Sequence, residues 1–270
     1  MKAIRVAVKT PNKLRVPGLR ENIGLYFSLS KFLKINSLRQ SRGGSPRFVF
    51  EADLSVSRVT YLDADLWFRK NPAPIFTEFE LSGKHVLITD HAYASEYDLS
   101  ATSGQYCVQF VTFVRNTGEV VRKWWEDRCI EWCFGYFEDG KFGDQMYLDD
   151  WPLRFCNEVH VLDNKELTLA PWNARRFPYG NAVFFHFHGL RIASPRKLNL
   201  GKFYLPRPVI KYVYRPYASE LNEAVNRLEE SGFFLQAQAQ PLGVMRRALW
   251  RLTFLYRQFR QAIPKHTLRW

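Results

Sequence analysis

Short apolar segments alternate with helical segments between Phe48 and about Gly201. Runs of valine, isoleucine, phenylalanine and tyrosine favour strands, whereas apolar residues that recur every three or four positions favour helices. The alternation predicts an α/β domain in which helices cover a mixed, mostly parallel sheet. The expected strands are 58–62, 84–89, 106–114, 158–162 and 181–189; the expected helices are a short one after Pro72, then 118–134, 143–151 ending before Pro152, and one capped by Ser219.

Two aspartates, Asp63 and Asp65, directly follow the strand-forming run "RVTYL". Aspartate disfavours strands and is costly to bury without a partner, so the pair needs compensation. Two carboxylates one residue apart on a turn after a strand can bind one hard cation, directly or through water. Ligands of open α/β sheets bind at the carboxyl ends of the strands. The pair therefore predicts a site in which Mg²⁺ or Mn²⁺ holds a diphosphate.

The net charge of +13 is concentrated at the two ends of the sequence. Residues 1–50 carry +10 and residues 243–270 carry +7, which leaves −4 for the middle. Nucleic-acid binders usually carry their basic stripe on the folded domain itself, so this distribution argues against a nucleic-acid partner. Basic ends suit an anionic membrane surface, and solvated charge that favours solubility is the alternative.

The C-terminal segment has the pattern of a basic amphipathic helix. On a helical wheel, Val244–Ile263 gathers its apolar residues on one side and its arginines on the other, with Trp250 and Phe254 among the arginines. Aromatic rings among cations suit a membrane interface, whereas a helix docked on the body is the alternative. Because no long apolar run or secretory signal is visible, we expect a cytoplasmic protein, peripheral on the inner face of the cell membrane, with reduced cysteines.

A series of motifs follows in order between Arg58 and Arg191: "VTYLDADLWF", "NPAPIF", "YCVQFVTF", "DGKFGDQMYLDDWPLRF", "LAPWN" and "FFHFHGL". In this order they resemble the motifs of bacterial nucleotide-diphospho-sugar glycosyltransferases with the GT-A fold, which are distantly similar to the glycogenin-like (family 8) transferases. The resemblance implies a metal-dependent hexosyltransferase-like enzyme. Its expected partners are a nucleotide sugar donor and a cell-envelope glycan or glycolipid acceptor, as in lipopolysaccharide or other glycan biosynthesis.

The resemblance also implies a metal site. Asp63 and Asp65 match the metal-binding pair, Asp63 also approaching the donor, and His186 matches the histidine that completes the site. A histidine nitrogen beside carboxylate oxygens favours Mn²⁺, although Mg²⁺ can bind as well. His186 and His188 are alternate residues of one expected strand, so packing in a core is the alternative.

Other residues match positions near the donor or the acceptor. Asp144 and Gln145 match a pair that approaches the transferred sugar, and a helix cap is the alternative for Asp144. Trp172 and Asn173 are expected to line the acceptor or sugar pocket, with a structural tryptophan as the alternative. Arg191 is expected to contact the leaving diphosphate, because an arginine fork suits phosphate oxygens.

The part of the sequence before Asp63 is shorter than the resemblance leads us to expect. Residues 19–33 resemble the helix that precedes the acidic strand, and they place Arg20 as a diphosphate contact. Cys107 stands where relatives commonly have asparagine facing the donor. The alternative to an active transferase is therefore a truncated, inactive remnant that binds metal or glycan at a membrane surface.

These features divide the sequence into four parts. We expect a basic, shortened N-terminal segment over 1–47 and a GT-A-like catalytic core over 48–205. A C-terminal helical extension is expected over 206–242 and a basic amphipathic helix over 243–270.

Overall fold

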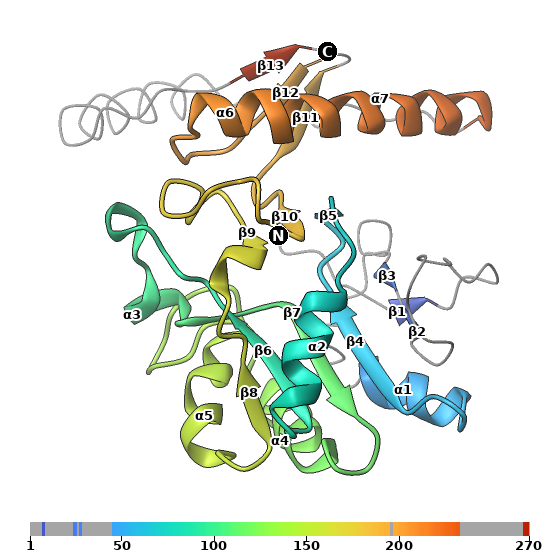
Figure 1. Cartoon of the computed structure of the whole chain (residues 1–270), viewed down its shortest axis with the longest axis vertical. Helices are drawn as coiled ribbons and strands as arrows, with labels where there is room; N and C mark the ends of the chain where they lie inside the picture. The colour runs from blue at the N-terminus through green and yellow to red at the C-terminus, as the bar shows by residue number, and fades with distance from the viewer. Residues whose placement is uncertain are drawn as a thin grey trace. The chain divides into compact units, whose positions relative to one another are not determined.

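The computed structural model describes residues 7–8, 24–25, 27–28, 45–194, 197–232 and 267–269. The chain forms two compact units, Met1–His186 and Phe187–Trp270. The first unit contains a five-stranded sheet with helices, and the second contains a small sheet and a long helix (Figure 1). The predicted mixed α/β class is confirmed.

The central sheet has the strand order β2-β4-β7-β6-β8. β2 is parallel to β4, β8 is parallel to β6, and β7 is antiparallel to both β4 and β6. Four strands therefore point in one direction and β7 is reversed, so that the carboxyl ends of β4, β6 and β8 share one edge with the start of β7. The strands are β2 (Gly24–Leu25), β4 (Arg58–Leu62), β6 (Val86–Asp90), β7 (Tyr106–Val114) and β8 (Val159–Val161).

Helices pack on both faces of this sheet. One core contains Tyr61 of β4 together with Trp125 and Trp151, whose rings meet edge-on at 5.8 Å. The other core joins Phe76 of α2 to Phe110 of β7, and Figure 1 shows α2 on the near face of the sheet. The helices are α1 (Ser45–Ala52), α2 (Ala73–Leu81), α3 (Ser100–Ser103), α4 (Glu119–Glu131) and α5 (Trp151–Arg154).

A small second sheet lies against the central one. It consists of β5 (Leu66–Phe68), β10 (Phe184–His186) and β9 (Thr168–Leu169), with β10 antiparallel to β5 and parallel to β9. The ring of Phe184 stacks on Phe110 of β7 at 5.7 Å. This contact anchors β10 to the central sheet. Near the N-terminus, β1 (Ala7–Val8) pairs with β3 (Phe27–Ser28).

The second unit contains its own sheet and an extended helical segment. β12 pairs antiparallel with both β11 and β13. Phe187 stacks on Tyr217 with ring centroids 3.8 Å apart and meets Tyr214 edge-on. The elements are β11 (Arg191–Ser194), β12 (Lys197–Asn199), β13 (Thr267–Arg269), α6 (Arg207–Val209), a π-helical turn (Ile210–Tyr214) and α7 (Arg215–Glu230).

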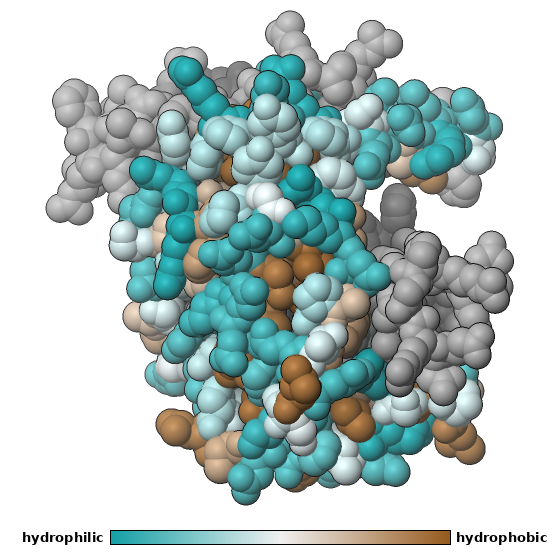
Figure 2. All heavy atoms as spheres, in the orientation of Figure 1, coloured by the Kyte–Doolittle hydropathy of each residue, from teal (hydrophilic) through white to brown (hydrophobic). Residues whose placement is uncertain are grey.

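The surface of the described residues is largely polar. On the face shown in Figure 2, hydrophilic residues predominate and apolar residues occur in small, separate groups. Among the helices that the structure describes, none has the length and apolar character needed to cross a membrane.

The strand predictions agree best with the structure where an apolar run is bounded by polar residues. The predicted strands 58–62 and 106–114 are confirmed with their bounds. The strand predicted over 84–89 is β6, and that predicted over 158–162 is β8. The predicted strand 181–189 is much shorter, because only the three residues of β10 pair with neighbours.

The helices predicted after Pro72 and over 118–134 are confirmed as α2 and α4, and the helix predicted after Ser219 is part of α7, but two helix boundaries were wrong. The segment 143–151 contains a 3-10 helix, Met146–Asp150, and α5 begins directly after it at Trp151 and includes Pro152. Ser219 does not cap a helix, because α7 begins at Arg215. Proline fits the first turn of a helix, where its missing N–H has no partner to lose.

The two basic ends differ from the predicted helices where they are described. Within 19–33, the structure has short strands at Gly24–Leu25 and Phe27–Ser28. Thr267–Arg269 is a strand, so the helix predicted over 243–270 is wrong for these last residues. The segment Val244–Ile263 lies outside the described residues.

Candidate metal-binding site

The turn after β4 carries both predicted aspartates. The backbone N–H of Asp63 donates to the carbonyl of Gln109 on β7 at 3.0 Å, and the N–H of Leu66 donates to the carbonyl of Asp63 at 3.3 Å. These hydrogen bonds hold a tight turn between β4 and β5. Asp63 is 6% exposed, whereas the side chain of Asp65 is 37% exposed. The turn therefore presents one buried and one partly exposed carboxylate.

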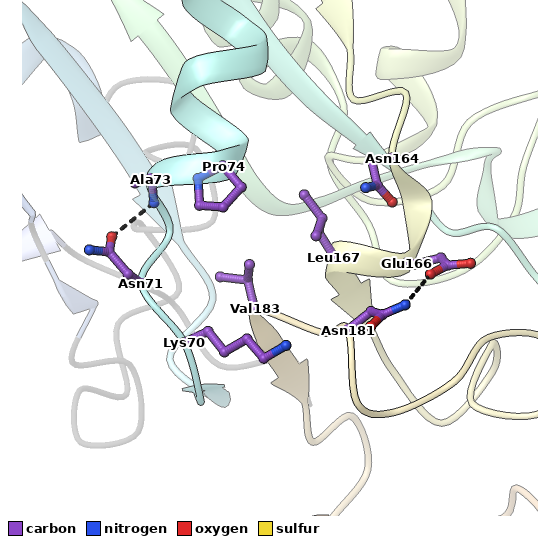
Figure 3. Close-up of a pocket in the computed structure, with 9 residues that line it drawn as sticks. All are labelled: Lys70, Asn71, Ala73, Pro74, Asn164, Glu166, Leu167, Asn181 and Val183. Carbon is purple, nitrogen blue, oxygen red and sulfur yellow. Dashed lines mark hydrogen bonds between the residues drawn. The ribbon is translucent and has the colours of Figure 1, made fainter.

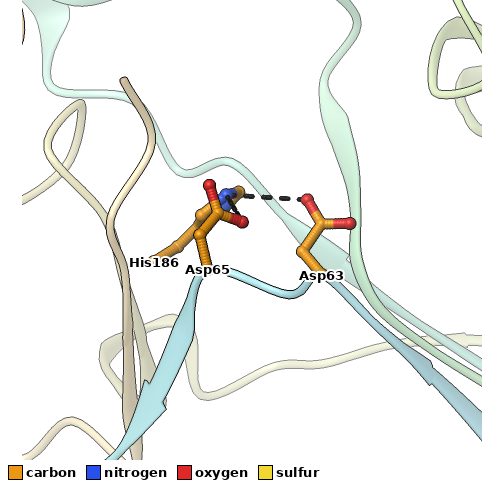
Figure 4. Close-up of side chains that lie close together, drawn as sticks. All are labelled: Asp63, Asp65 and His186. Atoms are coloured by element: carbon orange, nitrogen blue, oxygen red, sulfur yellow. Dashed lines mark ion pairs between the residues drawn. The ribbon is translucent and has the colours of Figure 1, made fainter. Parts of the chain in front are cut away.

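His186 reaches this turn because β10 pairs with β5. In the antiparallel register His186 lies opposite Leu66, the residue after Asp65. Its Nε2 is 3.2 Å from Asp65 Oδ1 and 3.5 Å from Asp63 Oδ2 (Figure 4). Ligand atoms of the three side chains all lie within 4.8 Å of one another. The structure thus brings together the three residues that were predicted to bind a metal.

Buried neighbours hold the imidazole of His186 from the side away from the carboxylates. His186 Nδ1 is 2.8 Å from Gln109 Oε1, and Gln109 Nε2 donates to Thr89 Oγ1 at 3.3 Å. The ring of Trp172 meets the imidazole edge-on, with centroids 5.2 Å apart and planes at 82°. These contacts fix the imidazole plane and direct Nε2 toward Asp63 and Asp65.

The donor atoms of this cluster suit a divalent cation. The amide oxygen of Gln109 accepts from His186 Nδ1–H, so in the neutral form of the ring the lone pair lies on Nε2 and faces two carboxylates. Negative oxygens facing a lone pair in a buried position require a positive atom between them, either a proton or a metal ion. Carboxylate oxygens with an imidazole nitrogen are suitable ligands for Mn²⁺ and, less selectively, for Mg²⁺. Asp63, Asp65 and His186 therefore fit a divalent metal ion.

The loop after β6 supports Trp172. The carbonyl of His91 accepts hydrogen bonds from Trp172 Nε1 at 2.8 Å and from Asn173 Nδ2 at 3.0 Å. The imidazole of His91 stacks on Tyr93 at 4.7 Å and meets Trp172 edge-on at 5.1 Å. Burial raises the pKa of Tyr93 well above its ordinary value, and nearby Cys107 and acidic side chains raise it further. Tyr93 therefore contributes a neutral ring to this support.

Trp172 and Asn173, predicted together, are placed differently. Trp172 touches His186 and so lies beside the cluster. Asn173 is 1% exposed, and its amide also bonds to the backbone N–H of Ala170 at 2.8 Å and the carbonyl of Thr168 at 3.2 Å. These bonds use its oxygen and both amide protons within the loop. The predicted contact of Asn173 with a sugar gains no support from this geometry and stays a prediction.

Asp144 and Gln145 lie between α4 and the 3-10 helix. Asp144 is buried, and its carbonyl accepts the Trp125 Nε1 proton at 2.8 Å. Gln145 occupies the position before the 3-10 helix, so the alternative of Asp144 as its cap is wrong, and the Gln145 amide donates to the carbonyl of Ser103. Among the described residues, the metal-ligating cluster does not include Asp144. The roles of this pair toward a transferred sugar stay predictions.

The two arginines predicted to contact a diphosphate remain untested. Arg20 lies outside the described residues. Arg191 is the first residue of β11 in the second unit and is exposed.

A pocket of about 430 Å³ lies elsewhere in the first unit (Figure 3). Asn71 Oδ1 accepts the N–H of Ala73 at 2.9 Å, and Asn181 donates to Glu166 at 2.7 Å. Val183 lines the pocket just before β10, and His186 ends that strand, so the pocket and the cluster lie at opposite ends of β10. The pocket is lined by Lys70, Asn71, Ala73, Pro74, Asn164, Glu166, Leu167, Asn181 and Val183.

Two residues of the site, Gln109 and Thr89, were not predicted. Both are buried, at 0% exposure, in neighbouring strands. A signal was present in the strand "YCVQFVTFV", where Gln109 interrupts an otherwise apolar centre. A buried amide is costly unless its hydrogen bonds are made, so its position indicated a polar partner.

The chain matches no family model, but it is similar in sequence to two uncharacterized bacterial proteins. It is 28% identical over 210 residues to the uncharacterized protein YfnD of Bacillus subtilis (strain 168), covering 69% of this chain and 65% of the relative. It is 30% identical over 164 residues to the uncharacterized protein YfnF of the same organism, covering 54% of each. The chain thus spans between about half and two thirds of the length of these relatives.

Two solved structures show distant similarity. One is a glycosyltransferase involved in the glycosylation of the major capsid of PBCV-1, with a TM-score of 0.41 and 15% identity, covering 58% of this chain and 74% of that one. The other is mouse xyloside xylosyltransferase 1 in its apo form, with a TM-score of 0.33 and 14% identity, covering 56% and 62%. Because both scores are low, neither similarity defines the activity of this chain.

Proposed function

We propose that the chain is a metal-dependent glycosyltransferase that moves a sugar from a nucleotide-diphosphate donor to a cell-envelope glycan or glycolipid. The observation that carries this proposal is the cluster of Asp63, Asp65 and His186 after the carboxyl end of β4. Ligands of open α/β sheets bind at this edge. The ordered motifs that resemble nucleotide-diphospho-sugar transferases support the same activity.

The cluster would act on the leaving diphosphate. Asp63, Asp65 and His186 would hold a divalent ion, which when bound neutralises negative charge as the diphosphate departs. Asp63 is buried and fixed by its N–H bond to Gln109, and His186 is fixed by the Gln109 amide. Ligands held in this way need little reorganisation when the donor binds, which is the condition for effective electrostatic stabilisation.

The acceptor is proposed to lie at an anionic membrane surface because of the charge of the C-terminal segment. Residues 243–270 carry +7 and no acidic residue. Each basic residue near an anionic bilayer contributes on the order of 1 kcal/mol. Flotation with anionic liposomes should therefore weaken when residues 243–270 are removed, and equal flotation of both proteins would contradict the membrane proposal.

The activity is tested with the full chain, Mn²⁺ and a panel of nucleotide sugars, by following release of the nucleoside diphosphate. We expect Mn²⁺-dependent release that Asp63→Asn and Asp65→Asn abolish. Asp127→Asn is the matched control, because Asp127 pairs with Lys123 on the exposed side of α4. Mn²⁺ binding without release from any donor would reject turnover and support an inactive metal-binding protein instead.

A further inference from the structure

We infer that Thr89 and Gln109 form a hydrogen-bond relay that sets the tautomer of His186 and, through it, the affinity of the cluster for a divalent metal ion. Thr89 is then a positioning residue, because its contact in the relay is with Gln109. The inference rests on the proposed metal site. It adds two residues, in β6 and β7, that control the metal affinity of that site.

The carbonyl of Cys107 determines which groups of the relay donate hydrogen bonds and which accept them. A carbonyl oxygen only accepts hydrogen bonds, so Thr89 Oγ1, at 3.3 Å, must donate its proton to Cys107. The oxygen of Thr89 then accepts from the Gln109 amide nitrogen at 3.3 Å. Thr89 thereby orients the Gln109 amide, with its nitrogen toward β6 and its oxygen toward β10.

The orientation of the Gln109 amide decides which nitrogen of His186 carries the proton. Gln109 Oε1 is 2.8 Å from His186 Nδ1, so Nδ1 must be the donor. The neutral ring then has its lone pair on Nε2, the atom that faces both carboxylates. A metal ligand must offer a lone pair at that atom, and the hydrogen bond of the other nitrogen fixes the tautomer. If the amide were reversed, its N–H₂ group would face Nδ1 and favour a proton on Nε2.

Gln109 also positions the first carboxylate. Its backbone carbonyl accepts the N–H of Asp63 at 3.0 Å, while its side chain holds His186. One residue of β7 therefore connects the β4 turn and the end of β10, which supply ligands from distant parts of the sequence. Gln109 and Thr89 are both 0% exposed, so water does not substitute readily for either hydrogen bond.

The test removes the hydroxyl of Thr89 while keeping its shape. In Thr89→Val the Gln109 amide has no acceptor in β6 and can reverse. We expect the Mn²⁺ dissociation constant to rise by about tenfold or more, the range found when outer-shell partners of metal ligands are lost. Thr89→Ser keeps the hydroxyl and should bind Mn²⁺ as the wild type does. Thermal unfolding of the metal-free proteins checks that all variants are folded.

A second pair of variants, built on Gln109→Glu, tests whether Thr89 acts by preventing reversal of the Gln109 amide. Glutamate in place of Gln109 still accepts from His186 Nδ1 but has no N–H₂ group to turn toward it. Adding Thr89→Val to Gln109→Glu should therefore cause no further loss of Mn²⁺ affinity. A further tenfold loss in the double variant would show that Thr89 acts through packing, and it would overturn the relay.

The tautomer itself is read by ¹⁵N NMR of histidine-labelled, metal-free protein, with His186→Gln used to assign the signal. We expect a proton on Nδ1 in the metal-free wild type, where Gln109 Oε1 accepts it, and no proton on Nδ1 in Thr89→Val, where the reversed amide donates to that nitrogen. A proton retained on Nδ1 in Thr89→Val overturns the relay even if Mn²⁺ binds to the wild type. A changed tautomer in a protein that binds no Mn²⁺ supports the relay and rejects the proposed metal site, so the two failures are distinguishable.

Discussion

Without metal, Asp65→Asn should be more stable than the wild type. With Mn²⁺ bound, the wild type should be the more stable protein. Without metal, the carboxylates of Asp63 and Asp65 repel each other, because their ligand oxygens lie within 4.8 Å. Two unit charges at such a distance repel by about 3 kcal/mol at an effective dielectric constant of about 20. The side chain of Asp65 is 37% exposed, and solvent screening reduces this to on the order of 1 kcal/mol. Metal-free Asp65→Asn should thus be about 1 kcal/mol more stable than wild type.

Added Mn²⁺ should stabilise the wild type much more than the variant. A ligand at about 100 times its dissociation constant stabilises the folded state by about 2.7 kcal/mol. Asp65→Asn lacks one ligand and should lose most of this gain, so that the wild type becomes the more stable protein. Urea unfolding at equilibrium, with and without Mn²⁺, measures both differences. Asp127→Asn should respond to Mn²⁺ as the wild type does.

The opposite sign would refute this reasoning. If His186 is instead protonated and held as an ion pair with Asp63 and Asp65, removing a carboxylate removes an attraction. Asp65→Asn would then be less stable than the wild type in both conditions, and Mn²⁺ would change neither protein. The response to Mn²⁺ therefore separates a metal site from a structural ion pair.

Two further predictions concern the scaffold. Gly118→Ala should lower the free energy of unfolding by about 1 to 3 kcal/mol, because the new Cβ would lie 2.8 Å from the carbonyl oxygen of Val114 and 3.0 Å from that of His85. Gly180→Ala is the control, because its new Cβ would have nothing within 4 Å. Equal urea midpoints for the two variants would contradict the predicted clash at Gly118. Tyr147 has its pKa raised from 10.0 to about 12, chiefly by burial, so the folded state keeps the phenol neutral while the unfolded chain ionises. The wild type should therefore lose stability as pH rises through this interval, and Tyr147→Phe should lose less in urea unfolding at several alkaline pH values; parallel losses would reject this contribution.

The sequence predicted best those elements whose signal is local. β4 and β7 have the predicted bounds because each is a dense run of strand-forming residues. One helix boundary was misplaced because of a proline, since Pro152 lies in the first turn of α5. We expected the helix over 143–151 to end before Pro152, although the fixed φ and missing N–H of proline are also compatible with the start of a helix.

The site could be predicted only in part. Asp63 and Asp65 were identifiable as a pair because acidic residues at the end of an apolar strand need compensation. The approach of His186 depends on the pairing of β5 with β10, a contact between distant segments that no local pattern encodes. Gln109 left a signal as a buried polar residue, but its partners in β6 and β10 become evident only from the register of the strands.

The most direct test of the account is Mn²⁺ binding to the full chain, followed by electron paramagnetic resonance with and without a nucleoside diphosphate. We expect one bound Mn²⁺ per chain, loss of this signal in Asp65→Asn, and phosphorus-31 hyperfine coupling to the bound ion when the nucleoside diphosphate is added. Coupling would mean that diphosphate oxygens join the ion held by the cluster. Absence of bound Mn²⁺, or bound Mn²⁺ without phosphorus coupling, would contradict the proposed role of Asp63, Asp65 and His186.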